Sequence, residues 1–124
     1  MIPIETKDAP LPSGPYSQAV VSENTVFVSG QIPVDPADGS IPAGTEDQIR
    51  AALKNLISIL SAAGVEKGRI LRVTVYLTDM SDFALMNSVY KETFSEPYPA
   101  RTCIGVSSLP KGVKIMVDAV GELH

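Results

Sequence analysis

Residues 45–78, TEDQIRAALKNLISILSAAGVEKGRILRVTVYLT, change from a helical to a strand pattern within one stretch of the chain. In the first half, apolar residues recur with the 3.6-residue period of a helix, at Ile49, Ala52, Leu53, Leu56, Ile57 and Leu60. Thr45 to Gln48 matches a capping box, and Gly64 supplies a C-terminal stop. In the second half, two sets of side chains alternate, Leu71, Val73, Val75 and Leu77 against Arg72, Thr74, Tyr76 and Thr78. The stretch predicts a helix followed by a strand with one apolar face.

Upstream of this stretch the sequence predicts a β-hairpin. Residues 25–34, TVFVSGQIPV, are rich in β-branched and aromatic types, and residues 18–22 supply a partner strand across a turn at Glu23-Asn24. Downstream, residues 81–94 predict a second helix, whose apolar side carries Phe83, Met86, Tyr90 and Phe94.

Two further strands are expected at residues 101–107 and 113–121, joined by a turn at residues 109–112. The order of elements predicts an α+β fold in which two helices cover one face of a mixed sheet. The last strand is largely apolar on both faces, with Ile115, Val117 and Ala119 on one and Met116, Asp118 and Val120 on the other. Because a lone chain would expose one of these faces, we expect the protein to be an oligomer.

Composition narrows the class of protein. The chain has 124 residues, 44% of them hydrophobic and 19% charged, and we expect one domain over residues 1–124. No apolar run is long enough for a bilayer-spanning helix, no secretory signal is visible, and the one cysteine, Cys103, fits a reducing cytosol. We therefore expect a cytoplasmic protein with no membrane partner.

Charge and residue counts exclude several functions. The net charge of −4, with scattered Lys and Arg, makes nucleic acid an unlikely partner. One cysteine and one histidine, His124, rule out a Cys/His zinc site and a Ser-His-Asp triad within one chain.

Arg101 opens an otherwise apolar strand, and by strand parity it shares a face with Cys103. A guanidinium group suits a carboxylate, because its planar fork donates two parallel hydrogen bonds. The alternative is an exposed or salt-bridged arginine at a strand end. Cys103 is expected to be an inert packed thiol, since no histidine is near to activate it.

Asn87 and Asp118 fall on apolar sides of their elements. Asn87 is either a satisfied core residue or a site residue. Asp118 is either an acid or base in a partly buried setting or one half of a salt bridge. Ser29-Gly30 allows close approach of a ligand or backbone, and the turn at residues 14–16 could hang the Tyr16 ring over a pocket.

Taken together, these residues resemble the RidA/YjgF family of reactive-intermediate imine deaminases, also annotated in the past as endoribonuclease L-PSP. The likeness runs from about Asp8 to Gly121 and rests on five segments: GPYSQA at 14–19, VSGQIPVDPADG at 28–39, AGVEKGRILRVTVYLTDMSDFALMN at 63–87, PARTC at 99–103 and LPKGVKIMVDAV at 109–120.

The resemblance implies a chorismate-mutase-like fold, a homotrimer with clefts between subunits, and no cofactor or metal. Each cleft would take a 2-imino or enamine acid and hydrolyse it to a 2-keto acid and ammonia. Arg101 would clamp the substrate carboxylate with help from the Cys103 backbone amide. The remaining residues would line the cleft, partly from a neighbouring subunit: Tyr16, Ser29, Gly30 and Asn87.

The chain departs from the family pattern at two places. Members that deaminate usually carry KIEIEA on the last strand, whereas this chain has KIMVDA, so the carboxylate of Asp118 is one methylene shorter, about 1.5 Å of reach. The segment between Phe94 and Pro99 is also shorter than in typical members. Two alternatives to an imine deaminase follow: a non-catalytic module that binds 2-keto acids as a metabolic signal, and a ribonuclease, which the acidic charge and the lack of a histidine pair disfavour.

Overall fold

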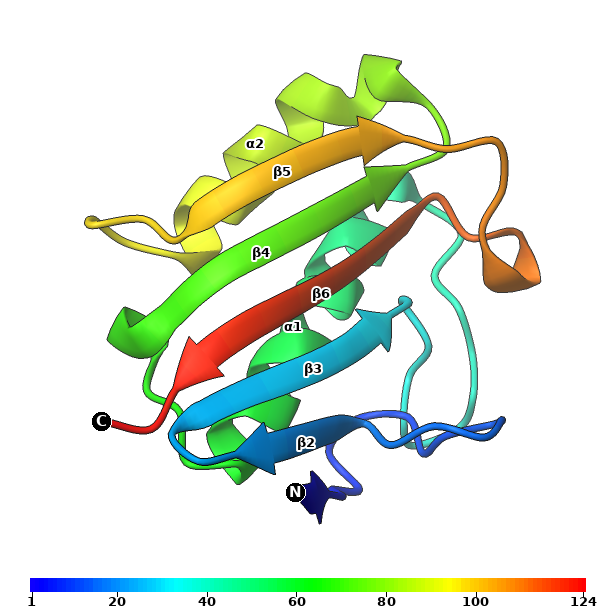
Figure 1. Ribbon diagram of the computed structural model, residues 1–124. Coiled ribbons are helices and arrows are strands. Elements are labelled where there is room, and N and C mark those ends of the chain that lie inside the picture. The colour runs from blue at the N-terminus through cyan, green and yellow to red at the C-terminus, as the bar shows by residue number, and fades with distance from the viewer.

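The computed structural model describes residues 1–124, which form one six-stranded sheet and two α-helices (Figure 1). The elements in chain order are β1 (Ile2–Ile4), β2 (Ala19–Ser22), β3 (Thr25–Gln31), α1 (Thr45–Ala62), β4 (Ile70–Leu77), α2 (Phe83–Thr93), β5 (Ala100–Gly105) and β6 (Ile115–Glu122). This order confirms the predicted one, with the short strand β1 added. The main difference in bounds is at β3, which ends at Gln31 rather than Val34.

The sheet is mixed, with the strand order β1-β2-β3-β6-β4-β5. β4 and β5 are parallel and are joined through α2, and all the other neighbours are antiparallel. The last strand of the chain therefore lies between β3 and β4. Side chains on β6 consequently meet residues from both halves of the sequence.

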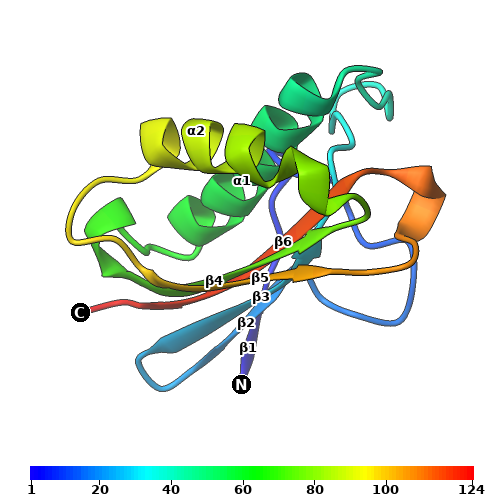
Figure 2. The same ribbon diagram turned by 90° about the horizontal axis from the view of Figure 1, so that it is seen from above.

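Both helices cover the same face of the sheet, as Figure 2 shows from above. On that face the core is mostly apolar, and its largest buried side chains include Ile49, Leu53, Leu56, Ile59, Leu60, Leu77, Met86 and Ile115. The other face, called here the open face, has no covering layer: Phe27 and Ile104 are 47% and 46% exposed there. The predicted two-helix layer is confirmed. Neither helix is long and apolar enough to cross a membrane.

The predicted capping box of the first helix is wrong. Gly44 is the N-cap of α1, and no side chain caps the helix. Gln48 is buried and uses both ends of its amide elsewhere, donating to the Pro42 carbonyl at 2.8 Å and accepting from the Lys114 amide at 2.9 Å. A buried amide must be satisfied, and these two loops supply the partners. The predicted stop at Gly64 is confirmed by its positive φ of 94°.

The predicted faces of β4 are wrong at one residue. Leu71, expected in the apolar row, is 44% exposed, whereas Ile70 is buried. The register between β4 and β6 shifts between Ile70 and Arg72, which leaves Leu71 as the extra residue of a bulge. Beyond the bulge the prediction is confirmed, because Val73, Val75 and Leu77 are all buried.

Candidate functional site

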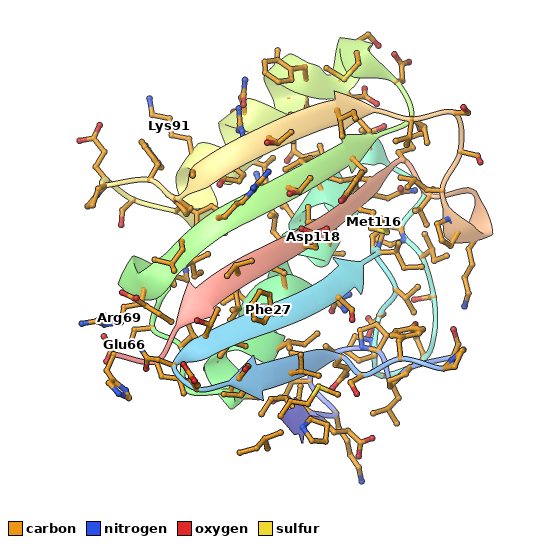
Figure 3. The ribbon with its side chains drawn as sticks, in the orientation of Figure 1. Phe27, Glu66, Arg69, Lys91, Met116 and Asp118 are labelled. Carbon is orange, nitrogen blue, oxygen red and sulfur yellow. The ribbon has the colours of Figure 1, made fainter.

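Asp118 lies in the middle of β6 on the open face and is half-buried (Figure 3). On one side its cross-strand partner is Thr74 of β4. On the other side the register of β3 and β6 shifts between Val28 and Gln31, so that Ser29 and Gly30 together oppose Asp118. Two residues opposite one make a β-bulge, a feature that re-aims side chains and is common beside active sites. Three of the expected site residues therefore meet here.

The Asp118 carboxylate is held by a tyrosine and not by a cation. Tyr76 Oη donates a hydrogen bond to Asp118 Oδ2 at 2.8 Å. The ion pairs of the molecule join Arg50 to Glu46 and Glu92, and Arg69 to Glu122, so the salt-bridge alternative for Asp118 is wrong. The hydrogen bond to Asp118, helped by burial, raises the pKa of Tyr76 above its usual 10.0. The phenol is therefore a hydrogen-bond donor at neutral pH.

The Met116 side chain lies against the glycine of the bulge. A Cβ atom on Gly30 would lie 2.7 Å from Met116 Sδ, so a larger residue at position 30 would require the flexible methionine side chain to move. Ser29 Oγ donates to the Ser17 carbonyl at 2.6 Å, which ties the loop before β2 to the bulge. Tyr16 precedes this tie and is 51% exposed. Ser29, Gly30 and Asp118 are called the Asp118 group below.

Arg101 lies on the other face of the sheet, the one that the helices cover. It is the second residue of β5 and pairs with the buried Val73. Its guanidinium carbon is 4.8 Å from the ring centroid of Tyr90 and 5.7 Å from that of Phe83, both on α2. Aromatic faces attract a cation at such distances. No carboxylate forms an ion pair with Arg101, so the salt-bridge half of the alternative is wrong, whereas the other half agrees with the structure, in which Arg101 is exposed.

A pocket of about 440 Å³ opens beside this arginine, lined by Asn87, Tyr90, Lys91, Glu96, Tyr98, Pro99 and Arg101. Asn87 is half-buried at its wall. Tyr90 is 5% exposed, and its hydroxyl has no hydrogen-bond partner. Burial raises the pKa of Tyr90, while the charge of Arg101 acts in the opposite direction. Asn87, Arg101 and Cys103 are called the Arg101 group below.

Cys103 shares the face of Arg101, as strand parity predicts, and packs against the core. Burial raises the pKa of the thiol above its usual 9.0, although the nearby positive charge of Arg101 opposes the effect. A thiol with a raised pKa is protonated at neutral pH and is a poor nucleophile. This agrees with the expectation that the Cys103 side chain does no chemistry.

The two groups do not meet within one chain. β5 and β6 are separated by β4, which places their backbones about 10 Å apart. The Arg101 side chain projects to the helix face, whereas Asp118 projects to the open face. A small molecule held by Arg101 in one chain therefore lies on the wrong side of the sheet for Asp118 of that chain.

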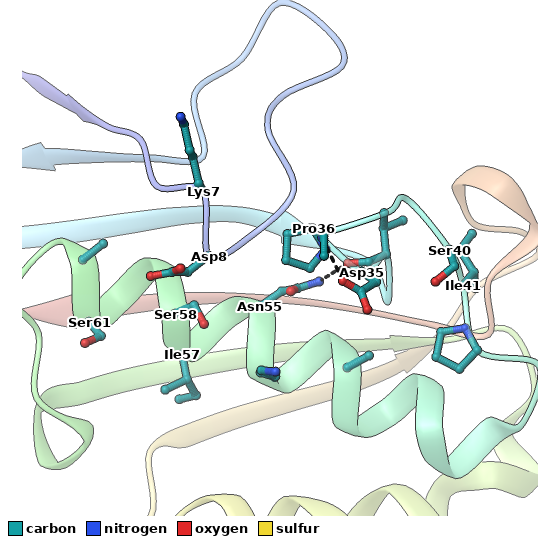
Figure 4. Close-up of a pocket in the computed structure, with 16 residues that line it drawn as sticks. Lys7, Asp8, Asp35, Pro36, Ser40, Ile41, Asn55, Ile57, Ser58 and Ser61 are labelled. Carbon is teal, nitrogen blue, oxygen red and sulfur yellow. Dashed lines mark hydrogen bonds between the residues drawn. The ribbon is translucent and has the colours of Figure 1, made fainter.

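A larger pocket, of about 830 Å³, lies elsewhere and contains none of the expected site residues (Figure 4). It runs between α1 and the segment around Asp35 and Pro36. Asn55 on α1 spends both amide hydrogens on this segment, donating to the carbonyls of Ile32 and Val34 at 3.0 and 2.9 Å. The pocket is thus a groove between a helix and the loop pinned to it. No three His, Cys, Asp or Glu side chains gather to hold a metal ion.

Comparison with known proteins identifies the family. The family model described as Endoribonuclease L-PSP matches residues 6–123. The chain belongs to this family, the RidA/YjgF family. Its α+β fold is that of the family: the crystal structure of Escherichia coli TdcF with bound serine superposes with a TM-score of 0.94, at 44% identity and 98% coverage of both chains.

Two relatives of this RidA/YjgF chain are described as deaminases. TdcF of Escherichia coli, described as a reactive intermediate deaminase, is 48% identical over 94% of this chain and 93% of its own. The 2-iminobutanoate/2-iminopropanoate deaminase of the same organism is 43% identical over 94% of both chains.

Sequence reasoning missed two residues of the site. Tyr76 was placed on the face opposite Val73 and Val75, but nothing in the sequence indicated that Asp118 would be its neighbour. Tyr90 was assigned to the apolar side of the second helix, where it lies, yet its ring also supports Arg101. The strand order is the signal that was lacking, because it alone brings β4 beside β6.

Proposed function

We propose that this protein is a deaminase of small 2-imino acids and their enamine tautomers, such as 2-iminobutanoate and 2-iminopropanoate. The reaction adds water to C2 of the imine and yields a 2-keto acid and ammonia. Relatives of 43% and 48% identity carry deaminase names, and the fold and the residues at both groups agree with that chemistry.

The state of Arg101 is the observation that carries this proposal. Its guanidinium lies over the rings of Phe83 and Tyr90 and lines a pocket that also contains Glu96, and it forms no ion pair within the chain. A positioned cation that forms no ion pair is suited to the carboxylate that every 2-imino acid carries. The fork of the guanidinium would bind both carboxylate oxygens and so orient C2 of the substrate. Asn87 and the Cys103 backbone amide would complete this half of the site.

Assembly would bring the Asp118 group of one copy to the Arg101 group of another. Because the Arg101 and Asp118 groups project to opposite faces of one sheet, a complete site needs the Arg101 group of one copy and the Asp118 group of the next. The open face supports such assembly, since Phe27 and Ile104 are exposed on it beside the half-buried Met116 and Val120. We propose a homotrimer with three equivalent clefts, as a closed ring of heterologous contacts provides.

In the reaction the Asp118 carboxylate would act as the general base that activates the attacking water. The water oxygen bonds to C2 while the Asp118 carboxylate takes one water proton and the electron pair of the C=N bond moves to nitrogen. That nitrogen then receives the proton. Collapse of the adduct forms the C=O bond and breaks the C–N bond, and the hydroxyl proton leaves with the ammonia through the same carboxylate.

A second candidate is a module that binds a 2-keto acid or an amino acid without turning it over. One solved relative, TdcF, was crystallised with bound serine, which has the carboxylate that Arg101 suits but no imine. In this alternative Arg101 keeps its role and Asp118 has none. RNA is a poorer fit to this chain, because its net charge is −4 and two of its arginines, Arg50 and Arg69, are in ion pairs.

The test couples this protein to a pyridoxal-phosphate serine or threonine dehydratase. The dehydratase is kept in excess, so that imine hydrolysis and not imine release limits the rate of keto-acid formation. We expect keto acid to form faster with the protein than without it, in proportion to the protein added. An equal rate with and without it, combined with keto-acid binding in a calorimetric titration, would establish the binding module instead.

A further inference from the structure

Tyr76 and Asp118 are 42 residues apart in sequence and form a diagonal cross-strand pair on the open face. Tyr76 pairs directly with Met116, and Thr74 pairs directly with Asp118. Such diagonal neighbours lie within reach of an aromatic side chain, and the Tyr76 hydroxyl spans the gap to Asp118 Oδ2 at 2.8 Å. The carboxylate therefore has one oxygen fixed by β4.

In this pair the tyrosine keeps its proton. The hydrogen bond to Asp118 and the burial of the ring both raise the pKa of Tyr76, whereas the positive charge of Arg72, on the same face of β4, acts to lower it. The hydroxyl thus stays a donor at neutral pH and the carboxylate an acceptor. No other side chain donates to Asp118, and β3 offers only the uncharged Ser29 and Gly30 at the opposing bulge.

From this geometry we infer that Tyr76 is a positioning residue for the reaction: it fixes Oδ2 of Asp118, so that Oδ1 is the oxygen presented to the attacking water. The inference rests on the proposed deaminase function. An aspartate side chain has two rotatable bonds, and one strong hydrogen bond to its carboxylate restricts both. In this role Tyr76 touches neither substrate nor water and keeps its proton throughout.

The deciding variant is Tyr76→Phe, which keeps the ring and removes only the hydroxyl. We expect kcat for imine hydrolysis to fall about tenfold with KM unchanged, which is the effect of losing one hydrogen bond to a charged group. Thr74→Val is the matched control: it removes the hydroxyl directly opposite Asp118, which makes no hydrogen bond to it, and should leave both kcat and KM unchanged.

A double variant shows whether Tyr76 acts through Asp118. In an Asp118→Asn background, Tyr76→Phe should cost no further activity, because two residues that act as one unit are not additive. A second tenfold loss in that background would overturn the inference, as would a Tyr76→Phe variant with the kcat of the wild type. Failure of the proposed function looks different: the wild-type protein itself would not accelerate keto-acid formation, and both proposals would be overturned together.

Discussion

The Arg101 group and the Asp118 group differ in what holds them. Arg101 is supported by aromatic rings of a helix, beside a pocket, on the face where the core lies. Asp118 is supported by two neighbouring strands, through a tyrosine hydroxyl on one side and a β-bulge on the other, on the face without a covering layer. The first arrangement is suited to binding an anion and the second to aligning a carboxylate with a water. In the proposed deaminase, binding and chemistry would therefore be separated within one chain and brought together by assembly.

The largest expected effect is on the rate of imine hydrolysis, from a substitution in the Asp118 group. Asp118→Asn keeps the size of the side chain and can still accept the hydrogen bond from Tyr76, but it cannot take a proton from water. We expect the rate of imine hydrolysis to fall about a hundredfold, as for the loss of a general base, and less where uncatalysed hydrolysis sets a floor. Calorimetric titration with 2-ketobutyrate should give the wild-type affinity. An unchanged rate with a lowered melting temperature would make Asp118 a structural residue.

A substitution in the Arg101 group should instead weaken ligand binding. Arg101→Lys keeps the positive charge and loses the fork that binds two carboxylate oxygens, so we expect the Kd for 2-ketobutyrate to rise at least about tenfold. Native mass spectrometry should find the same oligomer as for the wild type. Wild-type affinity in the titration would show that Arg101 is only a surface residue.

The smallest expected effect is on stability, from a substitution that removes the hydroxyl of Tyr90 and keeps its ring. Its ring faces Arg101, but its hydroxyl is buried without a hydrogen-bond partner, which is a cost to the folded state. Tyr90→Phe should therefore raise the free energy of unfolding by about 1 kcal/mol and leave 2-ketobutyrate binding unchanged. Thermal unfolding followed by circular dichroism measures the first, and titration the second. A loss of binding would mean that the hydroxyl donates to the ligand.

Local patterns were enough to predict most elements and the residue types at both groups. The 3.6-residue period placed α1, and the alternation placed β4, because each depends on neighbours within a few residues. Parity alone put Arg101 and Cys103 on one face. The errors arose where distant segments meet. Gln48 does not cap α1, because its amide hydrogen-bonds to the Pro42 carbonyl and the Lys114 amide. Leu71 does not face the core, because it is the extra residue of a bulge against β6.

The relation between the two groups could not be predicted from these patterns. The Tyr76–Asp118 hydrogen bond exists because β6 lies between β3 and β4, a strand order that no local period encodes. The bulge that brings Ser29 and Gly30 opposite Asp118 depends on the same insertion. The proposed pairing of opposite faces from two copies is harder still to predict from the sequence, because it depends on surfaces that exist only in the folded chain.

The measurement that tests this proposed pairing most directly is complementation between two impaired variants, with imine hydrolysis measured at a substrate concentration that does not saturate Arg101→Lys. Chains with Arg101→Lys and chains with Asp118→Asn are mixed in equal amounts, unfolded, and refolded together, and native mass spectrometry verifies that mixed oligomers form. If each site takes Arg101 from one copy and Asp118 from the next, about one quarter of the sites in the mixture combine two intact groups. We predict that imine hydrolysis recovers to about a quarter of the wild-type rate per chain, well above either variant alone. Mixed oligomers with no more activity than the two variants measured separately would contradict the account.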